Sequence, residues 1–154
     1  MLILSPRSVW FDGQRWDDVT LVAIDRVAAR AVLEWSDAGR HAVFADVPEE
    51  KVTIRIARRV HAGSPAAGEN GLRCGAEGEL VLISAAEESV AARRRVKCRG
   101  VVVRVSHELS EKSGCVRVVE IAALSADGAA DPLVITELDG LSDEEADDAA
   151  GGGA

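Results

Sequence analysis

The sequence predicts a mainly β fold, an antiparallel β-sandwich or barrel with one flanking α-helix and a long β-hairpin. The hairpin is the clearest element, because residues 96–124 contain two largely apolar segments joined by a polar, glycine-containing turn at residues 109–114. Most other segments alternate apolar and polar side chains with a period of two, as half-buried strands do. Only residues 85–94 have the terminal signals of a helix.

The first elements of the chain are short and end at turn residues. Residues 2–4 are predicted to form an edge strand, and residues 9–16 a strand or aromatic turn around Asp12 and Gly13. We expect the aromatic side chains of this segment to close one end of the core, with a patch on a partner surface as the alternative. They are Trp10, Phe11 and Trp16.

A second hairpin is predicted next. Its β-like residues are 19–24 and 28–35, its turn is 36–39, and its return strand is 41–47. The segment around Pro48 should end this strand, because the residue before proline is held extended and proline has no N–H for the ladder. Residues 52–60 then have the clearest alternation in the chain, with Val52, Ile54 and Ile56 on one face.

Residues 61–78 are rich in glycine and have no periodicity, so they are predicted to form a long loop. A short apolar strand follows at residues 79–83.

His41 and His61 are expected to be solvated residues on strand faces, because no carboxylate or thiol forms a recognisable site pattern with them.

The flanking helix is predicted at residues 85–94. Ser84 and Glu87 match a capping box, and the arginines at residues 93–95 suit the negative end of the helix dipole. An anion or nucleic-acid patch is the alternative role for these arginines. After a turn-rich segment, the last strand is expected at residues 133–138.

The two strands of the long hairpin differ: the first has one aliphatic and one mostly polar face, whereas the return strand is mostly apolar on both faces. Val101, Val103 and Val105 give the first strand an aliphatic face, because alternate residues of a strand point the same way. The return strand has Val119 and Ile121 on one side and is mostly apolar on the other. A strand covered on two faces in so small a protein suggests that the outer face is covered in an assembly.

Length and charge suggest one domain and an acidic tail. A chain of 154 residues can bury about 70% of the surface that it exposes when unfolded. We expect residues 1–138 to form the β domain and residues 139–154 an Ala/Gly-rich tail. The net charge is −8, and the last 18 residues carry seven carboxylates and no basic side chain. This argues against affinity for nucleic acid through phosphate contacts.

The cysteines and the first residues point to a reduced, soluble protein. Cys74, Cys98 and Cys115 are odd in number and lack metal-ligand spacing, so buried thiols are expected, with no metal and no cofactor. The apolar run before Pro6 is too short for a signal peptide or a membrane anchor.

No sequence motif for catalysis is present, so we expect no enzyme and no catalytic residue. Residues 26–30 and 34–39 are similar to the RxxxR and (D/N)xSxxG pieces of the cyclic-di-GMP-binding PilZ domain. Two departures are that Glu34 replaces Asp or Asn and that the pieces are almost contiguous. A monomeric β-barrel that binds a ligand is therefore one alternative function.

Two segments resemble the major tail tube proteins of long-tailed bacteriophages and related prophages. They are VLEWSDAGRHAVFADVPE at residues 32–49 and IAALSADGAADP at residues 121–132. The order of strand, long loop, strand, helix and long hairpin between them also matches, so the resemblance covers roughly residues 2–138. The acidic terminus after this region is a departure from the family.

The resemblance implies a virion protein whose six copies close into a ring by head-to-tail contacts. Rings would stack into a hollow tail tube, assembled in the host cytoplasm, that joins other phage tail proteins and lets DNA pass without binding it. Another tail component, such as a terminator or distal tail protein, is a further alternative. The implied subunit interface is Val101, Val103, Val105, Val119 and Ile121; the implied ring-stacking loop is Ser64, Pro65, Glu69, Asn70 and Leu72; the candidate lumen residues are Glu108 and Glu120.

Overall fold

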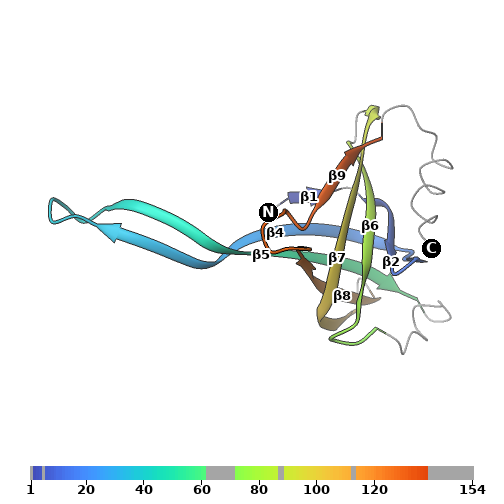
Figure 1. Ribbon diagram of the computed structural model, residues 1–154. Helices are drawn as coiled ribbons and strands as arrows, with labels where there is room; N and C mark the ends of the chain where they lie inside the picture. The colour runs from blue at the N-terminus through green and yellow to red at the C-terminus, as the bar shows by residue number, and fades with distance from the viewer. Residues whose placement is uncertain (1, 5, 62–71, 87–88, 112–113, 139–154) are drawn as a thin grey trace.

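The computed structural model describes residues 2–4, 6–61, 72–86, 89–111 and 114–138 (Figure 1). These residues form nine strands and contain no helix. The strands are β1 (Leu2–Leu4), β2 (Pro6–Phe11), β3 (Gln14–Arg15), β4 (Val19–Trp35), β5 (Ala42–Val60), β6 (Glu77–Ala86), β7 (Ser89–Ser110), β8 (Gly114–Leu124) and β9 (Val134–Glu137). The predicted mainly β class is confirmed.

All nine strands belong to one antiparallel sheet in the order β1-β4-β5-β8-β7-β6-β2-β3. β9 pairs with β7 at residues 94–97, whereas β8 pairs with β7 at residues 99–110. One buried cluster contains side chains from six of the strands, so the sheet curls around it. These strands are β2, β4, β5, β6, β7 and β8. A hydrogen bond from the Trp16 N–H to the Val9 carbonyl, 2.8 Å long, continues the pairing of the β2–β3 hairpin.

The return strand of the long hairpin and the strand at residues 52–60 bury the residues that were predicted to share a face. Val119 and Ile121 of β8 are fully buried beside Ile54 and Ile56 of β5, with Ile54 paired to Ile121 and Ile56 to Val119. Burying each such side chain contributes about 1.5–3 kcal/mol, so this strand pair anchors the core. Gly100 of β7 lies against Ile121 so closely that a Cβ there would be 2.4 Å from its Cγ2.

The aromatic segment also folds as predicted. Trp10, Phe11 and Trp16 are all buried. Asp12 and Gly13 have φ angles of 51° and 77°, the conformation of the two-residue hairpin turns that match strand twist. His41 and His61 are exposed, as expected, but they lie just outside β5 and not on a strand face, and His61 Nε2 is 3.7 Å from Asp18 Oδ2.

The predicted helix at residues 85–94 is wrong, because Ser84, Ala85 and Ala86 end β6 and β7 begins at Ser89. Ser84 pairs with Arg94 on one side, and Arg94 pairs with Glu137 of β9 on the other. A helix cap contributes only about 1 kcal/mol, and tertiary context such as this strand pairing routinely overrides local helix signals.

The expectation that Pro48 ends a strand is also wrong, since β5 runs unbroken from Ala42 to Val60. The register shifts between Arg30 and Val32 of β4, which pair with Glu49 and Asp46. Pro48 therefore lies at a bulge, where the ladder does not require an N–H.

The predicted aliphatic face of β7 is wrong for a similar reason. A register shift between Val102 and Arg104 leaves Val103 as the extra residue. Val102 is fully buried and pairs with Ile121, whereas Val103 is 43% exposed. Val105 pairs with Val119 and packs against the core, so the bulge moves it to the face of Val102.

Buried thiols were expected for all three cysteines, and only Cys98 fits. Burial raises the pKa of the Cys98 thiol to about 12. Cys74 is exposed and Cys115 is half-buried.

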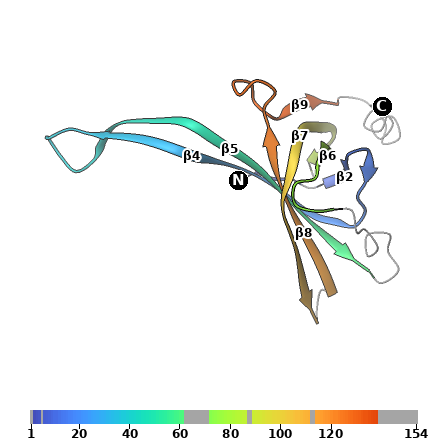
Figure 2. The same ribbon diagram turned by 60° about the horizontal axis from the view of Figure 1, so that its bottom comes forward.

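The distal part of the β4–β5 hairpin is the most unusual feature of the fold. Residues 27–51, called the arm here, leave the body as a two-stranded ribbon, and both views show its tip far from the other strands (Figures 1 and 2). All of the arm's residues are exposed except the half-buried Val32. The arm therefore has no core of its own and no cover from the described part of the chain.

Candidate functional site

The arm carries a concentration of exposed apolar side chains. Among the described residues, six of the eleven exposed large hydrophobic side chains lie on it. Exposed large apolar side chains gathered on one segment indicate a candidate interaction surface. The six are Val27, Leu33, Trp35, Val43, Phe44 and Val47.

The strand register places some of these side chains on a common face. Leu33 pairs with Ala45, so both point to the same side of the ribbon. Trp35 is two residues further along β4 and shares that side. Glu34 pairs with Phe44 and Val32 with Asp46 on the opposite side, so the second face mixes apolar and acidic groups.

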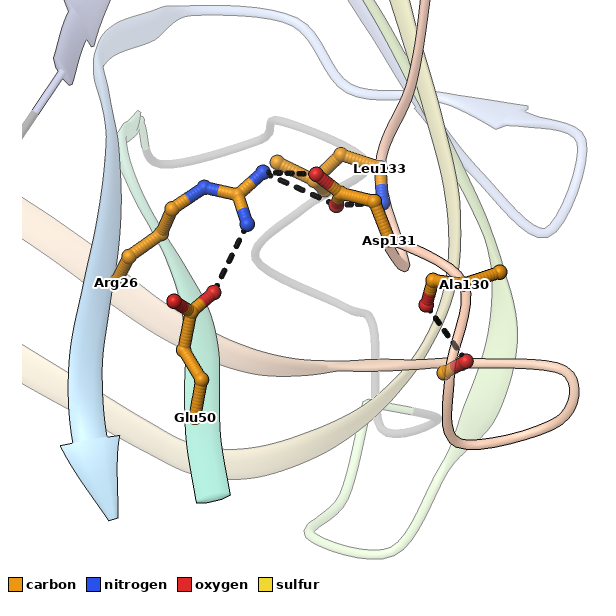
Figure 3. A network of polar contacts seen from close by, with 6 residues as sticks. Arg26, Glu50, Ala130, Asp131 and Leu133 are labelled. Atoms are coloured by element: carbon orange, nitrogen blue, oxygen red, sulfur yellow. Dashed lines mark hydrogen bonds and ion pairs between the residues drawn. The ribbon is translucent and has the colours of Figure 1, made fainter. Parts of the chain in front are cut away.

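The base of the arm is fixed by an ion-pair network around Arg26 (Figure 3). Its guanidinium donates from Nη1 to Glu50 Oε1 at 2.9 Å and from Nη2 to both carboxylate oxygens of Asp131, at 3.0 and 2.7 Å. The two carboxylates raise the pKa of Arg26. The pKa of Asp131 is lowered, first by the N–H of Leu133 and then by Arg26. The network joins β4, β5 and the segment before β9.

That segment, residues 125–132, is held by its own hydrogen bonds. The Ser125 hydroxyl donates to the Ala130 carbonyl at 2.7 Å, and Asp127 Oδ1 accepts from the N–H groups of Ala129 and Ala130 at 2.9 and 2.8 Å. These N–H groups lower the pKa of Asp127. The base loop, as these residues are called below, is therefore preorganised against the arm.

A pocket of about 390 Å³ lies between the arm and the base loop. It is called the base pocket below. Its lining combines short apolar side chains with the charged Arg26 network. Residues that line it are Arg26, Val47, Pro48, Glu50, Val52, Ala123, Ser125 and 128–132.

The two segments that carry the tail tube resemblance meet at this place. Residues 32–49 form most of the arm, and residues 121–132 form the end of β8 and the base loop. Both contribute to the base pocket, through Val47 and Pro48 from the first segment and Ala123 and Asp131 among others from the second. Segments that are distant in the sequence thus form one structural unit.

The five residues expected at a subunit interface differ in how far they are buried within the subunit. Val119 and Ile121 are fully buried inside the subunit, so a neighbouring subunit cannot contact them. Val101 and Val105 are half-buried, and Val103 is the exposed member of the set. The structure brings these five residues together on one hairpin but turns most of them inward.

The ring-stacking loop lies mainly beyond the described residues. Ser64, Pro65, Glu69 and Asn70 fall in the segment 62–71, which the structure does not describe, and Leu72 is half-buried against the core. The two candidate lumen residues lie within the described part of the chain. Glu108 is exposed, and Glu120 lies 3.9 Å from Arg104 across the hairpin.

The PilZ-like pieces do not converge on a ligand site. Arg26 is bound to Glu50 and Asp131, and Arg30 lies 3.7 Å from Glu49. Residues 34–39 are at the far end of the arm. The arginines and the second piece are therefore separated along one ribbon.

Sequence reasoning missed the arm as a surface and the base pocket. The signal for the arm was available, because residues 28–47 have apolar residues on both strand faces without the strict alternation of residues 52–60. No local signal existed for the pairing of Arg26 with Asp131, which are 105 positions apart.

A comparison with protein-family models finds no match for this chain, and a comparison with curated proteins finds none either. Within the described ranges, no group of three or more His, Cys, Asp or Glu side chains is arranged to hold a metal ion. The same residues include no helix with the length and hydropathy needed to cross a membrane.

Proposed function

We propose that this chain is a structural subunit that assembles with copies of itself through the arm. The observation that carries the proposal is the exposed apolar surface of residues 27–51, which extends away from the body (Figure 2). An exposed two-stranded ribbon is marginal in water by itself, so its natural state is against another surface. A second copy of the same chain is the simplest partner, because it can cover the arm without a different protein.

The arm and the body are different surfaces, so a contact between the arm of one copy and the body of the next is head-to-tail. Such contacts close into a ring when the rotation allows it and otherwise form a filament. A symmetric dimer of two arms is the alternative geometry. The edge strands β1 and β9 are further places where a neighbouring strand could pair.

The magnitudes favour a closed assembly over an isolated pair. The six apolar side chains of the arm are 48–67% exposed, and completing their burial contributes roughly 1 kcal/mol each, about 6 kcal/mol in all. Association costs about 4–15 kcal/mol. The affinity of a single arm contact is therefore weak. In a closed ring every copy makes two contacts, so ring formation is cooperative.

The assembly that we propose is the tail tube of a long-tailed bacteriophage, with six copies in each stacked ring and DNA passing through. The support is the resemblance of residues 32–49 and 121–132, which form the arm and its base. A lumen lined by carboxylates would repel the phosphates of passing DNA, and Glu108 and Glu120 are the candidate lumen residues. The same arm would serve a terminator or distal tail protein that forms a single ring.

The experiment is sedimentation of the full chain beside a variant in which Asn-Gly replaces residues 29–49. This turn joins Ala28 and Glu50, which are directly paired, and leaves the Arg26 network intact. We expect the full chain to form oligomers and the variant to be a monomer with an unchanged melting temperature. A monomeric full chain, or oligomers of equal size from the variant, would contradict the proposal.

A further inference from the structure

We propose that the base pocket of one copy receives the side chain of Trp35 from the arm of a second copy. The inference rests on the proposed self-assembly and names the contact that produces it. Trp35 is the last residue of β4 and is 57% exposed, whereas Trp10 and Trp16 are buried. Tryptophan is the residue type most enriched among interface residues that dominate binding energy.

Trp35 cannot reach the base pocket of its own chain. Trp35 pairs with Ala42, and five residue steps along β5 separate Ala42 from Val47, the lining residue nearest the tip. At about 3.3 Å per residue this separation is roughly 16 Å. The ladder from Ala28 with Glu50 to Trp35 with Ala42 keeps the arm extended. Figures 1 and 2 show the tip away from the body. The pocket that takes Trp35 must belong to another molecule.

The lining of the base pocket suits an indole ring. Arg26 lies in the pocket with its guanidinium held by Glu50 and Asp131, so it is already ordered and loses little side-chain entropy when an aromatic ring stacks on it. Val47 and Pro48 provide apolar contact. The carboxylates of the network can accept the indole N–H.

The same pairing of arginine and tryptophan occurs twice within the subunit. The guanidinium carbon of Arg58 lies 5.1 Å from the centre of the Trp16 ring, and that of Arg15 lies 5.8 Å from the Trp10 ring. Trp35 is the third tryptophan, and Arg26 is an ordered arginine in a pocket. A contact between copies would give Trp35 the environment that the other two already have.

The position of the two parts determines the kind of assembly. Trp35 is near the tip of the arm and the base pocket is at its root. Each copy can therefore insert its Trp35 into one neighbour and receive Trp35 from another neighbour in its base pocket. Because the two surfaces differ, the contact is head-to-tail and continues from copy to copy. A second copy is the natural occupant, since the two parts are present in equal number.

The test compares the full chain with two variants, Trp35→Ala and Ala129→Phe. The first removes the inserted side chain, and the second places a large side chain in the wall of the base pocket. Phe44→Ala is the matched control, because it removes an exposed aromatic side chain from the other face of the arm. Assembly is measured by sedimentation over a range of concentrations, with circular dichroism to verify folding.

We expect each of the two variants to need about 30-fold higher concentration to assemble, and the control about 5-fold, because Phe44 contributes only general apolar burial. An equimolar mixture of Trp35→Ala and Ala129→Phe should form dimers, because one intact tryptophan meets one intact pocket. Assembly of Trp35→Ala at the wild-type concentration would overturn this inference and leave the proposed self-assembly standing. A full chain that stays monomeric would overturn both.

Discussion

Arg26 and Asp131 are 105 positions apart in the sequence, and two hydrogen bonds of 2.7 and 3.0 Å join their side chains. The pair connects Arg26, which directly precedes the arm, to the base loop, and Glu50 extends the contact to the second strand of the arm. The contact therefore ties the base loop to the root of the arm.

The change Asp131→Asn should loosen the base loop with little loss of global stability. Both side chains are partly exposed, and exposed ion pairs contribute less than about 1 kcal/mol. We expect a nearly unchanged urea midpoint and faster hydrogen exchange in residues 125–133. Asp37→Asn, in the turn at the arm tip, is the control. Equal exchange in both variants would show that the pair does not order the loop.

Acidification should disorder the base loop below the usual carboxylate range. The pKa values of Asp127 and Asp131 are lowered in the folded protein, by backbone N–H groups first and, for Asp131, also by Arg26. A carboxylate with a lowered folded pKa stabilises the fold above its unfolded pKa, and this contribution disappears as the pH falls through the folded pKa.

The measurement is the pH titration of the amide resonances of Ala129, Ala130 and Leu133, which donate to these carboxylates. We expect midpoints below the ordinary Asp pKa of about 3.9. Midpoints at or above that value would contradict the assignment. Asp127→Asn should abolish the titration of the first two amides.

Gly100→Ala should destabilise the core by about 1–3 kcal/mol. A Cβ at this position would be 2.4 Å from Ile121 Cγ2, and overpacking of a filled core costs energy of this size. Gly39→Ala is the matched control, because nothing lies within 4 Å of a Cβ there. Chemical unfolding of both variants measures the difference, and equal midpoints would refute the close packing of β7 on β8.

Ile121→Asp should prevent folding of the subunit itself. Ile121 is fully buried, and an unpaired buried carboxylate costs several kcal/mol, comparable to the stability of a whole domain. Val103→Asp on the same hairpin should leave the fold intact, because Val103 is 43% exposed. Circular dichroism separates the two cases. A folded Ile121→Asp monomer would mean that the residue serves an interface instead.

The sequence predicted the strands whose apolar residues alternate regularly. Residues 52–60 and the hairpin around Val119 and Ile121 were predictable because one face of each is buried along its whole length. The predicted helix failed because Ser84 and Glu87 are local signals, and the strand pairing that overrides them comes from residues distant in the sequence.

Bulges account for the other errors, because one inserted residue changes which side chains point inward. Pro48 is accommodated at one bulge, and Val103 is the extra residue of another. The candidate site was the least predictable part. Its central contact joins Arg26 to Asp131, and no sequence pattern near either residue predicts that the two pair.

Electron microscopy of the concentrated full chain distinguishes a ring-forming subunit from a monomer. We expect rings of six copies that stack into hollow tubes, and we expect that replacing residues 29–49 with Asn-Gly leaves only single, folded subunits. Particles of one subunit from the full chain at every concentration, or tubes from the shortened chain, would contradict this expectation.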